Sequence, residues 1–325
     1  MVSTAIPSTI TERLRSIGYV VIENVLDPIM DLKPVLDDFE HVLDRLAADL
    51  AAKGYVKSTK VGVPFGPRLI DLTTEYGKSL APYFDISLPQ TSDLDHAPLN
   101  LSAAVFALIT NPRLLDIVET VVGPEILVSP VGHVRMKLPE NTLATGADTL
   151  MAKVPWHQDN GVLLDEADES EVLTVWIPLN DASTENGCLQ VISMPRETKL
   201  WPHASTPQAG VHIPSTCVDE SASIPLPMAA GGILLMHSRT LHSSLPNCTG
   251  DQIRISMDLR YQPPEQATGR PLFPSFLARS GVKGERLLKD ASQWAYLWET
   301  ARLALIKEEA LLHFNRWNAD SGSCA

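Results

Sequence analysis

The spacing of apolar positions divides the chain into a helical front, a strand-rich middle and a helical tail. In the front, apolar residues such as Val35, Phe39 and Val42 recur every three or four positions, which is typical of a helix with one buried face. The same pattern predicts helices at about 27–52, 101–110, 112–122 and 285–317.

Short apolar or alternating runs replace the helical pattern from Glu125 onward, after one earlier β-branched run at 19–22. These runs lie at about 125–138, 172–179, 187–193, 232–237 and 253–262. Short strands separated by turn-rich loops favour an antiparallel sandwich or jelly roll over alternating βαβ units. The loops at 139–153 and 195–222 are long, and loops of that length are often functional lids.

We find no internal repeat and no low-complexity segment, so we expect a single domain over residues 1–325. Its fold class is expected to be mainly β with helical decoration. We place a helical front at 1–124, a jelly-roll core with interspersed long loops at 125–265, and a helical tail at 266–325. Apolar residues of the tail are candidates for the core or for a dimer face, so a homodimer stays open.

The composition is that of an ordinary globular protein, with 44% apolar and 20% charged residues. A formal net charge of -13 argues against nucleic-acid binding and against docking on anionic membranes, because both need Lys/Arg patches. No apolar run reaches the length of a membrane span.

The four cysteines, at positions 188, 217, 248 and 324, form no CxxC pair. This spacing argues against a zinc ribbon and against a disulfide framework. The first residues lack the cationic and apolar regions of a secretory signal. A reducing cytoplasm is therefore the expected location.

His157-Gln158-Asp159 is the most informative motif of the chain. On an extended strand, side chains two residues apart point to the same side, so His157 and Asp159 can face one metal ion together. Two histidines and one carboxylate on one face of a metal are the usual ligands of non-haem Fe(II) oxygenases. The tripeptide alone is common, so a third ligand is needed from elsewhere in the chain.

The best third ligand is His242, which follows a strand-like segment opened by Gly231 and Gly232. The rival is His237, five residues earlier. It falls inside the apolar run, so we expect it to be a packed or hydrogen-bonded strand residue.

The run 253–261 alternates polar and apolar side chains, with Arg254 and Ser256 on one face. A guanidinium and a hydroxyl two positions apart suit a carboxylate at the back of a pocket, because guanidinium binds carboxylate through two parallel hydrogen bonds. The alternative is a strand whose polar face is in contact with water.

Together these residues resemble the phytanoyl-CoA dioxygenase family of Fe(II)/2-oxoglutarate oxygenases, over most of the chain. The matching segments are, in order, 14–22, 137–139, 156–159, 176–181 and 185–189, followed by His242 and Arg254. One segment departs from the family pattern: residues 193–198 replace its usual Pro-Gly-Ser-His turn near the substrate entrance. The substrate is therefore expected to differ from those of better-known members. Arg196 in this segment either meets an anionic substrate or is a surface arginine.

The resemblance implies a double-stranded β-helix core and assigns the site. By it, Fe(II) is bound by His157, Asp159 and His242, and Arg254 holds the far carboxylate of 2-oxoglutarate. Four further positions are assigned to the co-substrate pocket: Ser256, Ser244, Trp176 and His133. O₂ is the other substrate, and ascorbate is a candidate reductant.

The implied reaction oxidises a C–H bond of a small organic molecule and releases succinate and CO₂. Asp159 is retained where halogenating relatives carry a small residue, so hydroxylation is the expected outcome, with desaturation, cyclisation and epoxidation also accessible. We prefer a secondary-metabolite intermediate over an acyl-CoA, because no cluster of basic residues is suited to a CoA phosphate. Its pocket walls are expected in the front helices, a loop at 58–75, the loop at 195–222 and the segment after Pro263.

Two other functions stay open. The first is a cupin-like metal enzyme, an isomerase or a direct dioxygenase, that does not use 2-oxoglutarate. The second is a binding or scaffold protein that has kept the fold.

Overall fold

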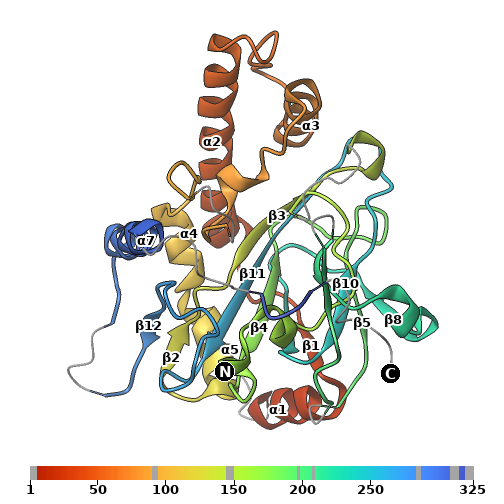
Figure 1. The fold of residues 1–325 in the computed structure, drawn as a ribbon, viewed down its shortest axis with the longest axis vertical. Helices are drawn as coiled ribbons and strands as arrows, with labels where there is room; N and C mark the ends of the chain where they lie inside the picture. The colour runs from red at the N-terminus through yellow and green to blue at the C-terminus, as the bar shows by residue number, and fades with distance from the viewer. Residues whose placement is uncertain are drawn as a thin grey trace.

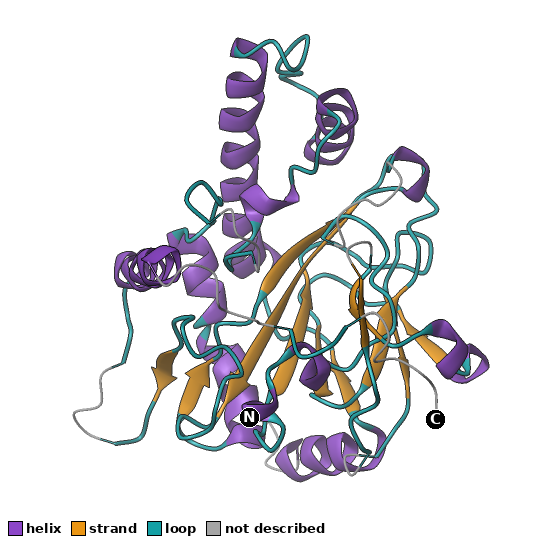
Figure 2. Cartoon of the chain, in the orientation of Figure 1, coloured by secondary structure: helices purple, strands orange, loops and turns teal. Residues whose placement is uncertain are grey.

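The computed structural model describes the chain in seven stretches, which Figures 1 and 2 show from one direction. They are residues 6–89, 94–143, 150–195, 198–206, 209–282, 287–307 and 315–318. Two antiparallel sheets form the centre of the molecule, and helices surround them (Figure 2). The expected jelly-roll fold with helical decoration is confirmed.

The large sheet has seven strands in the order β1-β9-β4-β11-β2-β12, with β3 also paired to β11. Its strands are β1 (Tyr19–Ile22), β2 (Ile126–Val128), β3 (His133–Lys137), β4 (Leu173–Pro178), β9 (Ile233–His237), β11 (Arg254–Gln262) and β12 (Phe276–Arg279). The long strand β11 pairs with β4 along one edge and with β3 and then β2 along the other. It therefore runs through the middle of the sheet.

A smaller sheet has the order β10-β5-β8, and a separate hairpin joins β6 to β7. Their bounds are β5 (Leu189–Ile192), β8 (Ser223–Leu226), β10 (Leu241–Ser244), β6 (Ala204–Thr206) and β7 (Gly210–His212). One apolar cluster joins the facing sides of the two sheets, with Trp176, Leu234 and Met236 from the large sheet and Leu189 and Val191 from the small one.

Helices cover the outer side of the large sheet, where Ile255, Met257 and Leu259 of β11 belong to the main hydrophobic core. The α-helices of the structure are α1 (Ile6–Ile17), α2 (Lys33–Ala52), α3 (Phe65–Tyr76), α4 (Ala103–Ile109), α5 (Pro112–Val122) and α7 (Ala291–Lys307). The short α6 (Asp159–Val162) lies instead on the inner side of the sheet, where Asp159 contacts Arg260. The predicted helices at 101–110 and 112–122 are confirmed as α4 and α5. Asn111 caps α5 and Pro112 occupies its first turn, as its sequence favours.

Several expected boundaries are wrong in detail. The strands β1 and β12 lie outside the range 125–265 that we gave to the core, yet both belong to the large sheet. The segment 58–75, expected as a loop, holds most of α3, and the loop at 195–222 holds the β6–β7 hairpin. For β1 and β12 the reason is pairing with distant strands, β9 and β2, which local periodicity does not report.

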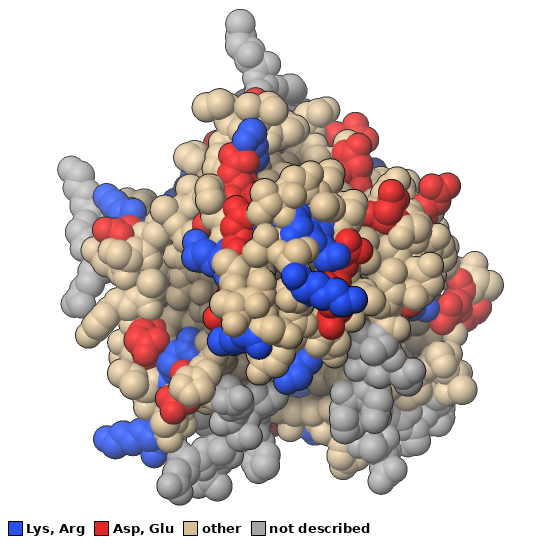
Figure 3. Space-filling model, turned by 90° about the horizontal axis from the view of Figure 1, so that it is seen from above, with Lys and Arg blue, Asp and Glu red and all other residues tan. Residues whose placement is uncertain are grey.

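The surface and the cysteines add two facts. On the face in Figure 3, Lys and Arg side chains lie beside Asp and Glu side chains and form no large basic area. Among the described residues, no helix is long and apolar enough to cross a membrane. Cys188 and Cys248 are free thiols, whereas Cys217 is disulfide-bonded, so cysteine usage alone does not decide the compartment.

Candidate metal centre

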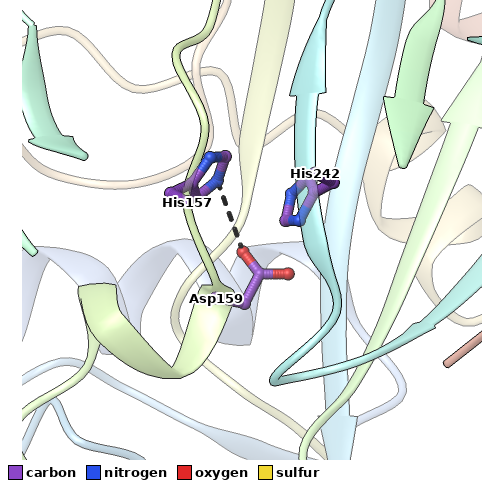
Figure 4. A group of neighbouring side chains, drawn as sticks. All are labelled: His157, Asp159 and His242. Carbon is purple, nitrogen blue, oxygen red and sulfur yellow. Dashed lines mark ion pairs between the residues drawn. The ribbon is translucent and has the colours of Figure 1, made fainter. Parts of the chain in front are cut away.

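The structure brings His157, Asp159 and His242 together in the interior (Figure 4). One ligand atom from each lies within 4.8 Å of the others, and all three residues are buried. The His157 Nε2 to Asp159 Oδ1 distance is 3.9 Å. The spacing argument gave the correct geometry for the first pair, because Gln158 between them is extended, at φ -115° and ψ 137°.

A short backbone bridge aligns the two histidines. The amide of His157 donates to the carbonyl of His242 and the amide of His242 donates back, both at 3.0 Å. His242 lies in β10, so this bridge fixes the loop that precedes α6 against the small sheet. The rings lie 4.2 Å apart between centroids.

Both imidazoles are held in the tautomer that a metal needs. The Nδ1 of His157 lies 2.9 Å from the carbonyl oxygen of Pro155, and the Nδ1 of His242 lies 3.0 Å from that of Thr240. A carbonyl only accepts, so each Nδ1 carries the hydrogen and each Nε2 keeps a lone pair. Burial, with the neighbouring His242, lowers the pKa of His157 to about 3. The ring is therefore neutral at physiological pH.

The carboxylate of Asp159 is fixed at both oxygens. Arg260 donates to Oδ1 at 2.6 Å, and Thr174 donates to Oδ2. These two residues are register partners on β11 and β4, so one position across the sheet supplies both donors. Burial raises the pKa of Asp159, but Arg260 and the two imidazoles outweigh it and hold that pKa below its ordinary range. Asp159 stays ionised.

A second part of the same interior holds Arg254, which is fully buried. Its Nε donates to the carbonyl of Gly187 at 3.2 Å, another guanidinium nitrogen donates to Ser256, and the guanidinium lies 5.6 Å from the ring centroid of Trp176. The polar face of β11 is thus shielded from solvent, and the interpretation as a wet strand face is wrong. Ser244 lies on β10 two residues after His242, where its Oγ accepts from the amide of Val154 at 2.8 Å.

Among the described residues, the charge of Arg254 is balanced only through space, by the electrostatic effect of Asp258, and not by a direct ion pair. No carboxylate among the described residues lies within ion-pair distance of it, and its register partner on β3 is another cation, Lys137. The Nζ of Lys137 makes no hydrogen bond and reaches Glu140 only at 3.9 Å. Burial lowers the pKa of Lys137 well below its usual value, and Arg254 adds to that effect. Opposed like charges in a dry interior are costly, so this place fits a bound anion.

A cavity of about 380 Å³ borders the metal triad on the side of His157. Arg260, His133 and Arg135 contribute polar groups to its wall, and prolines and valines make up much of the remainder. The Nδ1 of His133 lies within hydrogen-bond distance, 2.8 Å, of the Oδ2 of Asp85. His133 lines this cavity, whereas Arg254, Trp176, Ser244 and Ser256 do not line it, so the structure separates His133 from the other four. Arg196 lies outside the described residues.

Sequence reasoning missed the residues that hold the ligands in place. Arg260 and Thr174 fix Asp159, and Asp258 links Arg260 to Arg135, whose Nε lies 2.7 Å from the second Asp258 oxygen. The alternation of β11 did contain a signal for them, since Asp258 and Arg260 continue the face of Arg254. The contact of Arg260 with Asp159, 101 positions away, had no local signal.

Comparison with known proteins decides the family. The model of the phytanoyl-CoA dioxygenase family matches residues 14–256, which include the triad and Arg254. The chain belongs to the phytanoyl-CoA dioxygenase family. Curated relatives include phytanoyl-CoA dioxygenase domain-containing protein 1 of Bos taurus and of Rattus norvegicus, each 33% identical over 97 residues. Each alignment spans 28% of this chain and 33% of the relative, about a third of the relative's length.

Solved structures of similar fold cover most of the chain of this phytanoyl-CoA dioxygenase family member. The non-heme monooxygenase ThoJ in its apo form has a TM-score of 0.58 at 21% identity, covering 92% of this chain and 98% of ThoJ. The epimerase SnoN, solved with Fe³⁺, α-ketoglutarate and nogalamycin RO, has a TM-score of 0.53 at 20% identity, covering 89% and 95%. EvdO2 from Micromonospora carbonacea var. aurantiaca, solved with 2-oxoglutarate, scores 0.50 at 21% identity, covering 80% and 92%. At these identities the likeness shows the fold.

Proposed function

We propose that the protein is an Fe(II)/2-oxoglutarate-dependent dioxygenase that hydroxylates a C–H bond of a small organic molecule and releases succinate and CO₂. One observation carries the proposal: the interior that holds the His157, Asp159 and His242 triad also holds a buried arginine, Arg254, that forms no ion pair with any described residue. A metal site alone would suit many enzymes. A metal site beside an unpaired buried cation suits one that takes an anionic co-substrate.

The donor set fits Fe(II). Two neutral imidazole Nε2 atoms and one carboxylate oxygen form a facial set that leaves further coordination positions for the co-substrate and O₂. When bound, iron supplies the oxygen activation by which such enzymes attack unactivated C–H bonds. The protein's part is to orient the two rings, which the carbonyls of Pro155 and Thr240 do, and to keep the carboxylate ionised, which Arg260 does. Ascorbate is included in the proposal only as a reductant that restores Fe(II).

The co-substrate residues would bind 2-oxoglutarate by charge and shape. Arg254 offers a guanidinium to the far carboxylate, and the Ser256 hydroxyl that it now contacts can turn to the same group. Lys137 places its amine next to Arg254, and the indole nitrogen of Trp176, which has no partner within the described residues, adds a donor. Ser244 is proposed to line the same pocket from β10. Binding a dianion here would give Arg254 a direct ion pair.

The cavity beside His157 is proposed as the substrate chamber. Its volume of about 380 Å³ and its apolar wall suit a compact, mostly apolar molecule with a few polar groups, and they exclude water from the target carbon. A secondary-metabolite intermediate matches this description, in line with SnoN, which was solved with nogalamycin RO. We propose hydroxylation as the outcome because Asp159 occupies the position that a halide would need.

Anaerobic reconstitution tests the proposed function against the cupin-like alternative. Protein loaded with Fe(II) and 2-oxoglutarate is exposed to O₂, and succinate is quantified. The proposal predicts slow succinate release without substrate, lost in Arg254→Ala and retained in Arg45→Ala, an exposed arginine on α2. Fe(II) binding without any 2-oxoglutarate turnover would favour the cupin-like enzyme. Absence of Fe(II) binding would favour the scaffold protein. Mass spectrometry of turnover mixtures with candidate metabolites would then identify the substrate.

A further inference from the structure

We propose that the segment Asn315–Asn318, here named the C-terminal clasp, positions the metal-binding helix α6 and thereby sets the metal affinity of the site. The inference rests on the proposed metal role of His157, Asp159 and His242. The clasp is more than 150 positions from α6 in sequence, and it contacts α6 directly in space.

The helix α6 needs support from outside. It contains four residues, Asp159–Val162, and it begins at the ligand itself. A single turn makes too few internal hydrogen bonds to be stable alone. Its carbonyls at Asn160 and Gly161 both accept hydrogen bonds from the clasp.

The clasp supplies the missing donors for these carbonyls. The indole Nε1 of Trp317 donates to the carbonyl of Gly161 at 2.6 Å, and a guanidinium nitrogen of Arg316 donates to that of Asn160 at 2.9 Å. Another guanidinium nitrogen of Arg316 contacts Asp168 Oδ1 at 2.8 Å, which anchors the arginine itself. Two consecutive peptide groups after the ligand Asp159 are therefore held from one side by two consecutive clasp residues.

The clasp also reaches the peptide between the two motif ligands, through His203. The Trp317 ring stacks against His203 at 5.3 Å between centroids. The Nε2 of His203 accepts from the amide of Gln158 at 3.1 Å. This ring sits so close to α6 that a Cβ at Gly161 would lie 2.4 Å from it, so only glycine fits there. Trp317 thus supports the ring that orients the backbone between His157 and Asp159.

The same clasp holds a wall of the cavity. The amide of Ser205 in β6 donates to the carbonyl of Asn318 at 3.1 Å, and Asn315 donates to the Ser205 hydroxyl. The hairpin partner β7 contributes Gly210 and Val211 to the lining of the cavity, which also includes Val162 of α6. The clasp therefore connects the metal helix to the wall that faces the proposed substrate.

If this coupling holds, loosening the clasp lets α6 move and weakens metal binding, and metal binding in turn steadies the clasp, because such coupling is reciprocal. Partners that orient metal ligands typically change affinity about 10- to 100-fold when removed. Since the clasp acts through the backbone of α6, we expect the lower end of that range. A purely structural role would instead lower thermal stability and leave affinity for the metal unchanged.

The proposal is tested on the full chain by calorimetric titration with Mn(II) and with Fe(II) under anaerobic conditions, which measures the metal affinity of each variant. Trp317→Ala should weaken binding about tenfold and Arg316→Met about fivefold. Trp317→Phe, which keeps the ring and loses the N–H donor, should be intermediate, and Arg316→Lys should recover part of the loss. Tyr296→Ala removes an exposed aromatic ring of α7 and serves as the matched control, with wild-type affinity expected.

Melting of the metal-free variants separates affinity from folding. If Trp317→Ala does not fold, the metal affinities of Trp317→Phe and Arg316→Lys decide whether the clasp acts on the metal site. Affinities within twofold of wild type in Trp317→Phe and Arg316→Met would overturn the clasp. A wild-type protein that binds neither Mn(II) nor Fe(II) would instead overturn the metal assignment, and the clasp's role with it.

Discussion

Two buried arginines on one face of β11, Arg254 and Arg260, have opposite electrostatic surroundings. Arg260 contacts two carboxylates, those of Asp159 and Asp258. Arg254 contacts a carbonyl and a hydroxyl oxygen, and its register partner is the cation Lys137. Among the described residues, Arg260 is paired directly with two carboxylates, whereas Arg254 has no direct ion pair and feels Asp258 only through space. Pairing therefore distinguishes an arginine that shapes the protein's own metal ligand from one suited to a ligand from outside.

Removing the paired arginine is expected to have the largest effect. Arg260→Met should lower the free energy of unfolding of the metal-free protein by about 3–5 kcal/mol, because Asp159 and Asp258 would remain buried without their shared cation. Denaturant unfolding measures the change. Arg260→Lys keeps the charge without the two-pronged geometry, so it should lose less. If the Arg260→Met protein were as stable as wild type, Arg260 would not be needed to balance the buried carboxylates, and its contrast with Arg254 would fail.

Removing the unpaired arginine should act on the co-substrate and spare the fold. Arg254→Met is expected to weaken 2-oxoglutarate binding about 100-fold, since a charge-assisted two-pronged contact is lost. The metal-free stability should stay the same or rise, because an unpaired buried cation disappears. Anaerobic calorimetry on the Fe(II)-loaded protein measures affinity, with Arg45→Ala as control. Equal destabilisation by Arg254→Met and Arg260→Met would erase the contrast.

A pH effect is expected near the metal helix. Burial, partly offset by the hydrogen bond to Trp201, lowers the pKa of His203 to about 4 from 6.5. Between these values the unfolded chain holds more protons, so stability is full above pH 6.5 and falls as the pH drops toward 4. At pH 5 the loss from His203 is about 2 kcal/mol. The drop in unfolding free energy from pH 7 to pH 5 should therefore be smaller in His203→Gln than in wild type. The same drop in both proteins would contradict the role given to His203.

The smallest effect is expected at Thr174, which shares Asp159 with Arg260. Thr174→Val keeps the shape and removes one hydrogen bond to the carboxylate, so metal affinity should fall by about 1 kcal/mol, or roughly fivefold. The 2-oxoglutarate affinity of the metal-loaded protein should not change. Separate titrations of metal and co-substrate distinguish the two. A selective loss of 2-oxoglutarate binding would contradict this prediction, because it would place Thr174 with the co-substrate residues and not with the metal ligands.

Sequence reasoning succeeded where the signal is local. The extended His157-Gln158-Asp159 spacing, the helical periodicity at 101–110 and 112–122 and the alternation of β11 each act over a few residues, and the structure contains all three features. It failed where contacts are long-range. The pairing of β1 with β9, the contact of Arg260 with Asp159 and the clasp on α6 join positions about 100 or more residues apart. No periodicity reports which distant partner a buried side chain will find.

For the charged residues of the site, too, the local arrangement was predictable and the long-range partners were not. The residues Arg254 and Ser256 were predicted as a carboxylate site from their spacing, and they do lie side by side. Whether that arginine is paired could not be known from the strand alone, because its possible partners come from other strands. His133 was assigned to the co-substrate pocket together with Arg254. In the structure it contacts Asp85, from a separate segment of the chain, and lines the cavity beside His157.

The most direct test of the central claim is a titration of the anaerobic Fe(II)-loaded protein with 2-oxoglutarate, followed by visible absorbance and calorimetry. The account predicts saturable binding of one equivalent that depends on Fe(II), is lost in Arg254→Met and persists in Arg45→Ala. Binding that is unchanged in Arg254→Met, or no binding to an Fe(II)-loaded wild-type protein, would contradict it.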